Sequence, residues 1–208
     1  MKLILIYLLA ASSFAAAQFI TPEWRGSTDT EHAEWDIFTS ASEVNTPDVA
    51  SDTPSNDASL LCTTPSSFLT SSGNIYNFQS ATSFQIDDSS NYSIRSIFIQ
   101  INTLGTALDT ETARLIPPDA EGPDDILYPV NIYTLSEETL GGEFGGTGVT
   151  YAIQWDLSDH PITAGGTYSI LFSSVSSSMS LDKVSLDTSS TFETVANPTP
   201  LPTPSITQ

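Results

Sequence analysis

Short runs in which apolar and polar residues alternate dominate the chain from about residue 31 onward. Because successive side chains of a β-strand point to opposite faces, this alternation predicts strands. Clusters of Gly, Pro, Asn, Asp and Ser separate the runs, as expected for turns, and no run with a helical period stands out. The clearest predicted strands are residues 74–79, 82–86, 93–102, 128–135, 149–157 and 167–173.

Two of these runs indicate how the strands are buried. Every second residue of 149–157 is apolar, beginning with the first, which predicts an antiparallel strand with one buried and one solvated face. Residues 93–102 alternate in the same way after a change of phase near Arg95 and Ser96, where we expect a bend or bulge.

The connections between the runs favour a sandwich. Residues 117–125 contain three prolines and four acidic residues, and proline removes a backbone donor and fixes φ, so this segment is predicted to be a long acidic loop. About nine strands with such connections predict an all-β fold, an antiparallel β-sandwich of the jelly-roll type. A closed barrel is the main alternative.

The two ends of the chain differ from the middle. Residues 1–17 carry one cation, a short apolar run and then small residues, the pattern of a secretory signal peptide and too short to span a bilayer. Residues 18–30 read as an irregular lead-in, 31–196 as the sandwich domain, and 197–208, with four prolines, as a linker or tail. We therefore expect a secreted or cell-surface protein with no transmembrane helix in its mature chain.

The charge balance narrows the range of partners. Without the predicted signal peptide the chain has four Lys plus Arg against 25 Asp plus Glu, a formal charge of −21. Phosphate recognition depends on Lys and Arg, so we expect no binding to nucleic acid. Extracellular polysaccharide or other envelope components remain as partners. Cys62, the one cysteine, lies in an apolar run and is predicted to be a buried side chain.

The sequence contains no recognisable catalytic motif, and we expect that the protein is not an enzyme. It has two histidines, His32 and His160, and no Gly-x-Ser-x-Gly elbow. His32, Glu34 and Asp36 alternate along a predicted strand, where side chains on one face are about 6.5 to 7 Å apart and do not chelate a metal by default. No EF-hand loop occurs either.

The segment from Met179 to Thr188 resembles the closing strand of extracellular jelly-roll modules of the carbohydrate-binding and galactose-binding-like type. The matching residues are Leu181, Asp182, Lys183, Val184, Ser185 and Leu186. In such modules the Asp of this strand is often a ligand of a structural calcium ion. The resemblance therefore implies a Ca²⁺ role for Asp182. Considered without the resemblance, the segment predicts a strand with a bulge, because its apolar residues change phase between Leu181 and Val184.

A second resemblance extends over more of the chain. The predicted signal peptide, residues 35–38, residues 45–48 and the closing strand together look like exported PEP-CTERM-type bacterial proteins, which are linked to the envelope or to exopolysaccharide. The Pro-Glu-Pro motif, membrane helix and basic cluster that end those proteins do not occur in the printed sequence. The resemblance implies a displayed or secreted domain.

Two functions from different classes follow. The first is a non-catalytic binding module for glycan, in which exposed aromatic residues stack on sugar rings. The candidate ligand-binding residues are Trp24, Trp35, Tyr92 and Tyr133. The second is a structural or adhesive envelope protein that binds no small ligand. Exposed aromatic residues arranged in a groove favour the first function, whereas an acidic surface with all three tryptophans buried favours the second.

Overall fold

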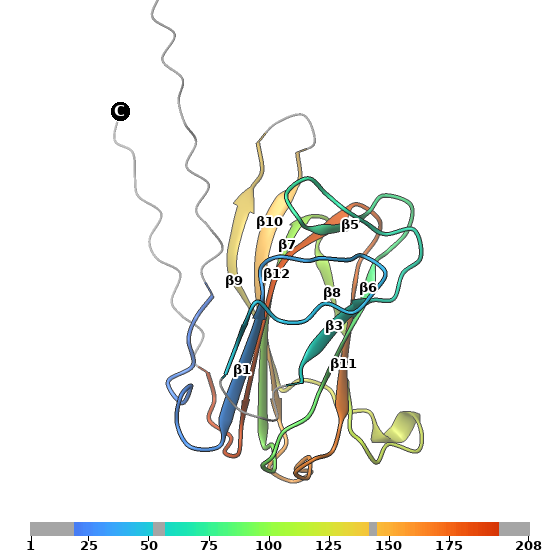
Figure 1. Cartoon of the computed structure of the whole chain (residues 1–208). Coiled ribbons are helices and arrows are strands. Elements are labelled where there is room, and N and C mark those ends of the chain that lie inside the picture. Colours follow the sequence, from blue (N-terminus) through green and yellow to red (C-terminus); the bar gives the residue numbers. More distant parts are fainter. Residues whose placement is uncertain (1–18, 52–56, 142–144, 196–208) are drawn as a thin grey trace, which may run out of the picture.

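The computed structural model describes residues 19–51, 57–141 and 145–195. The predicted signal peptide, residues 1–17, and the predicted tail, residues 197–208, lie outside the described residues. Two antiparallel sheets pack face to face in the described part (Figure 1). This arrangement confirms the predicted all-β sandwich and excludes the closed barrel, because the strands form two separate hydrogen-bonded sheets.

The large sheet has the strand order β2-β1-β12-β7-β10-β9, and β5 and β4 extend it beside the start of β12. Its strands are β1 (Thr30–Trp35), β2 (Val49–Ala50), β4 (Phe68–Leu69), β5 (Ile75–Asn77), β7 (Ser96–Gly105), β9 (Asn131–Thr139), β10 (Thr147–Asp156) and β12 (Met179–Ser189). β2 and β9 therefore lie at opposite edges of the main run of strands.

The small sheet has the order β3-β6-β11-β8. Its strands are β3 (Ser59–Cys62), β6 (Ser83–Asp88), β11 (Tyr168–Ser174) and β8 (Leu108–Ile116). Among the described strands the chain stays in one sheet only from β1 to β2, from β4 to β5 and from β9 to β10, and it changes sheet at every other connection. Frequent crossing between two packed sheets is typical of jelly rolls. The predicted acidic loop contains a short 3-10 helix, η1 (Pro123–Asp125). No helix in the described part of the chain is long and apolar enough to cross a membrane.

Strand positions follow the predicted pattern with local differences. β12 carries the predicted bulge, because its pairing with β7 changes register between Leu181 and Lys183. β9 begins at Asn131 and runs to Thr139, later along the chain than predicted. β8 was not among the clearest predicted strands, because its sequence LDTETARLI places polar residues at positions of both phases.

The prediction that this strand has one solvated face is wrong, because β10 is buried on both faces up to Trp155. Two terminal segments cover its outer side. The buried amide of Gln100 on β7 exchanges two hydrogen bonds with the backbone of Ile20, at 2.7 and 2.8 Å. Gln154 on β10 holds the other segment, donating to the carbonyl of Glu193 at 2.7 Å and accepting from the N–H of Val195 at 3.2 Å.

The core lies between the two sheets. Its largest fully buried side chains include Trp35, Trp155 and Tyr168, and the rings of Phe84 and Phe172 stack with their centroids 5.2 Å apart. Cys62 is buried in this core, as predicted. Burial of large aromatic and aliphatic side chains is the main favourable term in folding, so this chain forms a core without a disulfide.

Candidate functional site

The four aromatic residues predicted to bind a ligand lie in two different places. Trp35 is fully buried between the sheets and donates its indole N–H to the carbonyl of Asn45 at 3.0 Å. Tyr92 is also buried, and its hydroxyl lies 2.7 Å from Oγ1 of Thr188. Trp24 and Tyr133 lie on the outer face of the large sheet, where Trp24 belongs to a small buried apolar cluster and Tyr133, partly buried, packs against that cluster. The structure does not bring the four together on one exposed surface.

Asp182 lies at the bulge of β12. Its Oδ1 accepts a hydrogen bond from Nδ2 of Asn74 at 2.8 Å, and burial raises the pKa of its carboxyl above the usual value. Among the described residues, no three side chains of His, Cys, Asp or Glu converge as a metal would need. The calcium role of Asp182 stays a prediction from resemblance.

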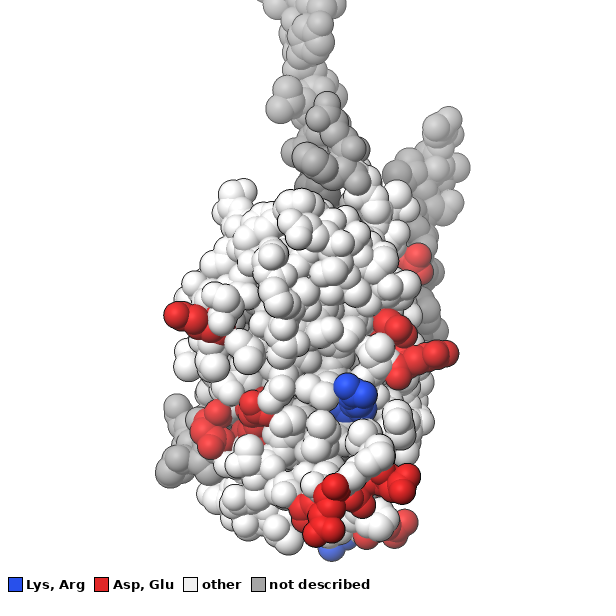
Figure 2. All heavy atoms as spheres, turned by 90° about the vertical axis from the view of Figure 1, so that its right-hand side faces the viewer, with Lys and Arg blue, Asp and Glu red and all other residues white. Residues whose placement is uncertain are grey.

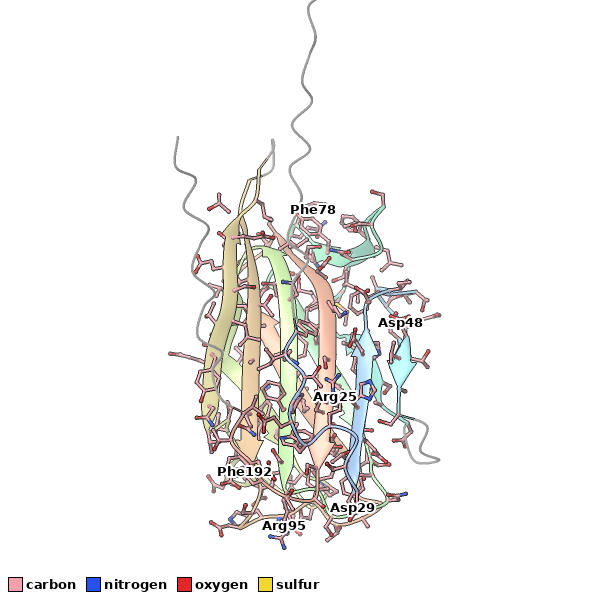
Figure 3. All side chains as sticks on the ribbon, turned by 90° about the vertical axis from the view of Figure 1, so that its left-hand side faces the viewer. Arg25, Asp29, Asp48, Phe78, Arg95 and Phe192 are labelled. Carbon is pink, nitrogen blue, oxygen red and sulfur yellow. The ribbon has the colours of Figure 1, made fainter. Side chains whose placement is uncertain are left out.

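Three aromatic side chains that sequence reasoning missed gather at one end of the sandwich. We call Phe68, Tyr76 and Phe78 the aromatic cluster. The ring of Phe68 lies 5.5 Å from that of Tyr76 and 6.0 Å from that of Phe78, both in edge-to-face orientation. Phe68 is 41% and Phe78 58% exposed, and Figure 3 shows Phe78 at this end of the molecule. Apolar side chains that gather on a surface commonly mark a binding site.

A buried asparagine holds the backbone beneath the aromatic cluster. Nδ2 of Asn77 donates to the carbonyl of Pro65 and to Oγ of Ser67, each at 3.2 Å. Its Oδ1 accepts the backbone N–H groups of Gln79 and Ser80 at 2.8 and 3.1 Å. Because Asn77 is fully buried and both ends of its amide are bonded, the aromatic rings on either side of it stand on a constrained loop.

The chain segment that carries the aromatic cluster has no charged residue. Residues 58–86 contain no Asp, Glu, Lys or Arg, although the whole chain has a net charge of −20. Figure 2 shows the side of the molecule on which the small sheet lies, and charged side chains there gather mainly on its lower half. The segment itself therefore adds no ionic group beside the three rings, and the carboxyl of Asp182 reaches it through the hydrogen bond from Asn74.

The predicted acidic loop borders a hollow with a volume of about 420 Å³. It is lined by Pro117, Pro118, Asp119, Asp124, Asp125, Leu127, His160, Pro161, Ile162, Thr163 and Gly166. Oδ2 of Asp125 accepts the backbone N–H groups of Glu121 and Gly122 at 2.8 and 3.0 Å. One of its three carboxylates thus has a structural role in closing the loop.

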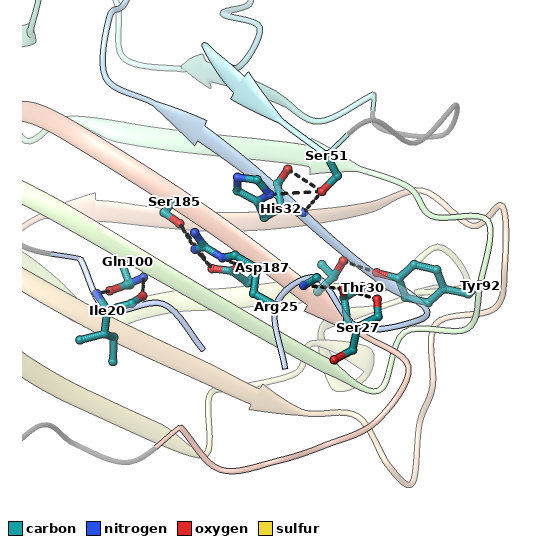
Figure 4. A network of polar contacts seen from close by, with 12 residues as sticks. Ile20, Arg25, Ser27, Thr30, His32, Ser51, Tyr92, Gln100, Ser185 and Asp187 are labelled. Carbon is teal, nitrogen blue, oxygen red and sulfur yellow. Dashed lines mark hydrogen bonds and ion pairs between the residues drawn. The ribbon is translucent and has the colours of Figure 1, made fainter. Parts of the chain in front are cut away.

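Polar contacts on the outer face of the large sheet hold the lead-in segment in place (Figure 4). Nε and Nη2 of Arg25 contact the two oxygens of the buried Asp187 at 2.5 and 2.7 Å. Burial raises the pKa of the Asp187 carboxyl, and the bond from Arg25 opposes that rise. Nearby, Oγ of Ser51 accepts the backbone N–H of His32 at 2.6 Å and lies 3.2 Å from its Nδ1. This Ser-His contact stabilises the edge of β1.

A titratable carboxyl is enclosed at the end of the core. Oδ2 of Asp88 accepts the hydroxyl of Tyr168 at 2.6 Å, whereas Oδ1 is buried and has no hydrogen-bond partner. Burial raises the pKa of Asp88 to about 7, and the charges of Glu31 and Asp57 act in the same direction. Asp88 is therefore a group whose ionisation opposes folding near neutral pH.

The fold and the site together define a β-sandwich domain of the jelly-roll type with an exposed aromatic cluster at one end. No protein-family model matches the chain, and comparison with curated proteins and with solved structures gave no significant match.

Proposed function

We propose that the protein is a non-catalytic, extracellular binding module and that its aromatic cluster binds an uncharged glycan. The observation that carries this proposal is the exposure of Phe68 and Phe78 beside Tyr76 within a long uncharged segment. Aromatic rings offer apolar faces for the C–H groups of a sugar ring, and a phenolic hydroxyl bonds to sugar hydroxyls. The predicted signal peptide supports an extracellular location.

The hydroxyl and amide groups near the aromatic cluster supply further hydrogen-bonding capacity. Oγ1 of Thr70 and Oγ of Ser72 lie 2.9 Å apart at the tip of the hairpin, and both residues are partly or fully exposed. Small polar groups of this kind orient a ligand, while apolar rings supply contact area. Because the rings of the cluster stand edge to face, the proposed ligand meets a single ring face and not a flat platform.

The test is a glycan array combined with a polysaccharide pull-down on residues 18–208. We expect binding to one or more uncharged glycans, and we expect Phe78→Ser to weaken it by about tenfold or more, as for a binding hot spot. Tyr128→Ser is the matched control, because Tyr128 is an exposed aromatic residue in a different loop. Circular dichroism of each variant verifies the fold. Equal binding of both variants would overturn the role of the aromatic cluster.

A second candidate is a structural or adhesive envelope protein without a small ligand. The burial of all three tryptophans, Trp24, Trp35 and Trp155, favours it, since surface tryptophans are frequent anchors in binding sites. A complete lack of binding across the glycan array and the pull-down, with a correctly folded protein, would transfer support to this function.

A further inference from the structure

The strand β9 forms one edge of the large sheet. Within the described residues it pairs with β10 on one side and with no strand on the other. An edge strand presents unpaired backbone N–H and C=O groups that can pair with another strand. β9 is long for an edge strand, since it runs from Asn131 to Thr139.

The core-facing side of β9 is not covered by the small sheet. Ile132 pairs in register with Ile153 of β10, and both side chains therefore point to the same side of the sheet. Ile153 is fully buried, whereas Ile132 is 41% exposed. The four-stranded small sheet thus covers β10 but leaves the neighbouring strand open, and an apolar side chain stands on the uncovered part.

The first part of β9 lacks charged residues, although a β-bulge at Leu135 interrupts its pairing with β10 and Pro129 stands just before it. Residues 126–136 contain no charged residue in a chain of net charge −20, and Glu137 and Glu138 follow directly. Tyr128 and Val130, which precede the strand, are both more than half exposed. Natural proteins commonly place charges along exposed edges to prevent pairing, so this edge is open to association.

We propose that β9 is a self-association surface, and that β9 of a second copy of this chain pairs with it in antiparallel orientation about a two-fold axis near Tyr133. This pairing joins the two large sheets into one continuous sheet. It brings Ile132 of each copy beside Thr134 of the other, on the side that the small sheet leaves open. Isologous contacts of this kind are the commonest form of homodimer.

The distribution of charge selects a second copy in this orientation. The antiparallel arrangement places Glu137 and Glu138 of one copy opposite the uncharged residues that precede Asn131 in the other. A parallel arrangement would place Glu137 opposite Glu137, and like charges directly across a sheet destabilise it. The uncharged stretch is also where two chains of strongly negative net charge approach with the least repulsion.

The proposal predicts a weak dimer that salt strengthens. One strand pair is a small interface, so we expect a dissociation constant on the order of 10⁻⁵ to 10⁻⁴ M. Salt screens the repulsion between the two acidic domains, so the dimer fraction is expected to rise between about 0.05 and 0.5 M NaCl. Associations between oppositely charged surfaces behave differently, because salt screens their attraction and weakens them.

Sedimentation velocity of residues 18–208 at increasing concentration tests the proposal, with Ile132→Lys as the disrupting variant. A lysine at this partly exposed position leaves the core intact and places a charge at each side of the axis. We expect at least about a tenfold rise in the dissociation constant. Val49→Lys is the matched control, because Val49 is a 49% exposed apolar residue on β2, at the opposite edge of the same sheet.

The outcomes separate this surface from the aromatic cluster. A dimer that survives Val49→Lys and Phe78→Ser but not Ile132→Lys supports pairing through β9. A protein that stays monomeric up to about 10⁻³ M at both salt concentrations overturns the proposal, as does a dimer that Ile132→Lys leaves unchanged. A dimer lost with Phe78→Ser alone would place the contact at the aromatic cluster and overturn it as well.

Discussion

Replacing Asp88 with asparagine is expected to stabilise the folded protein at neutral and alkaline pH. The Asp88 carboxyl is 5% exposed, and one of its oxygens has no hydrogen-bond partner. Asparagine has the same shape, carries no charge and keeps an oxygen that accepts the hydroxyl of Tyr168. The substitution therefore removes the ionisation of Asp88 while it preserves the bond to Tyr168.

The magnitude follows from the pKa of the carboxyl in the folded and unfolded chain. Burial raises the pKa of Asp88 from the ordinary 3.8 to about 7. The folded state thus holds a proton that the unfolded state releases, and this contribution to stability is fully present below about pH 4 and lost as the pH rises through about 7. Each pKa unit corresponds to about 1.4 kcal/mol, so the loss amounts to about 4 kcal/mol.

The net gain for Asp88→Asn is smaller than this loss. The new amide N–H₂ group takes the place of an oxygen without a partner, and a buried donor without a partner costs about 1 to 3 kcal/mol. We expect the variant to be about 1 to 3 kcal/mol more stable than the wild type at pH 8, and about 1 to 3 kcal/mol less stable at pH 4.

Urea unfolding between pH 4 and pH 8, followed by tryptophan fluorescence, measures this difference, because all three tryptophans are buried in the folded protein. The informative quantity is the difference in unfolding free energy between wild type and variant, since acidic groups that do not interact with Asp88 contribute equally to both. Asp119→Asn, an exposed carboxyl in the acidic loop, is the control for the loss of one negative charge. Parallel curves for wild type and Asp88→Asn would refute the reasoning.

Three further substitutions test other contacts. Arg25→Ala leaves the buried carboxylate of Asp187 without its cation. We expect the free energy of unfolding, measured with urea, to fall by about 3 to 5 kcal/mol. Adding Asp187→Asn is expected to restore much of this loss. The calcium role implied for Asp182 predicts that a chelator lowers the thermal midpoint of the wild type but not of Asp182→Asn; equal midpoints with and without chelator would reject it. Gly105→Ala places a Cβ 2.5 Å from the carbonyl oxygen of Ser178 at a φ of +88°, and we expect a loss of about 3 kcal/mol or more in the same urea assay.

Alternation along the chain was sufficient to predict most strands, because the period of two is a local property of the sequence. The bulge in β12 was equally readable, since apolar residues change phase at Asp182. β8 was missed because its polar residues hide the alternation. The two buried faces of β10 were missed because its outer cover comes from segments far away in the sequence, held by Gln100 and Gln154.

The candidate site depended more strongly on tertiary structure. Tryptophan and tyrosine are equally suited to cores and to binding sites, so sequence alone did not distinguish the buried Trp35 from an exposed ligand contact. The uncharged segment from residue 58 to residue 86 was a readable signal for the aromatic cluster. Its interpretation needed the hairpin that brings Phe68 beside Tyr76.

The sequence by itself determined that this protein is an acidic all-β sandwich, because strand periodicity, turn residues and net charge are all local or additive properties. Only the tertiary structure decided which aromatic side chains stay exposed, which carboxyl loses its solvent and which strand is left at an edge. Each of these depends on what packs against a side chain from a distant part of the chain. Asp88 beside Tyr168, and Ile132 beyond the reach of the small sheet, show this dependence most directly.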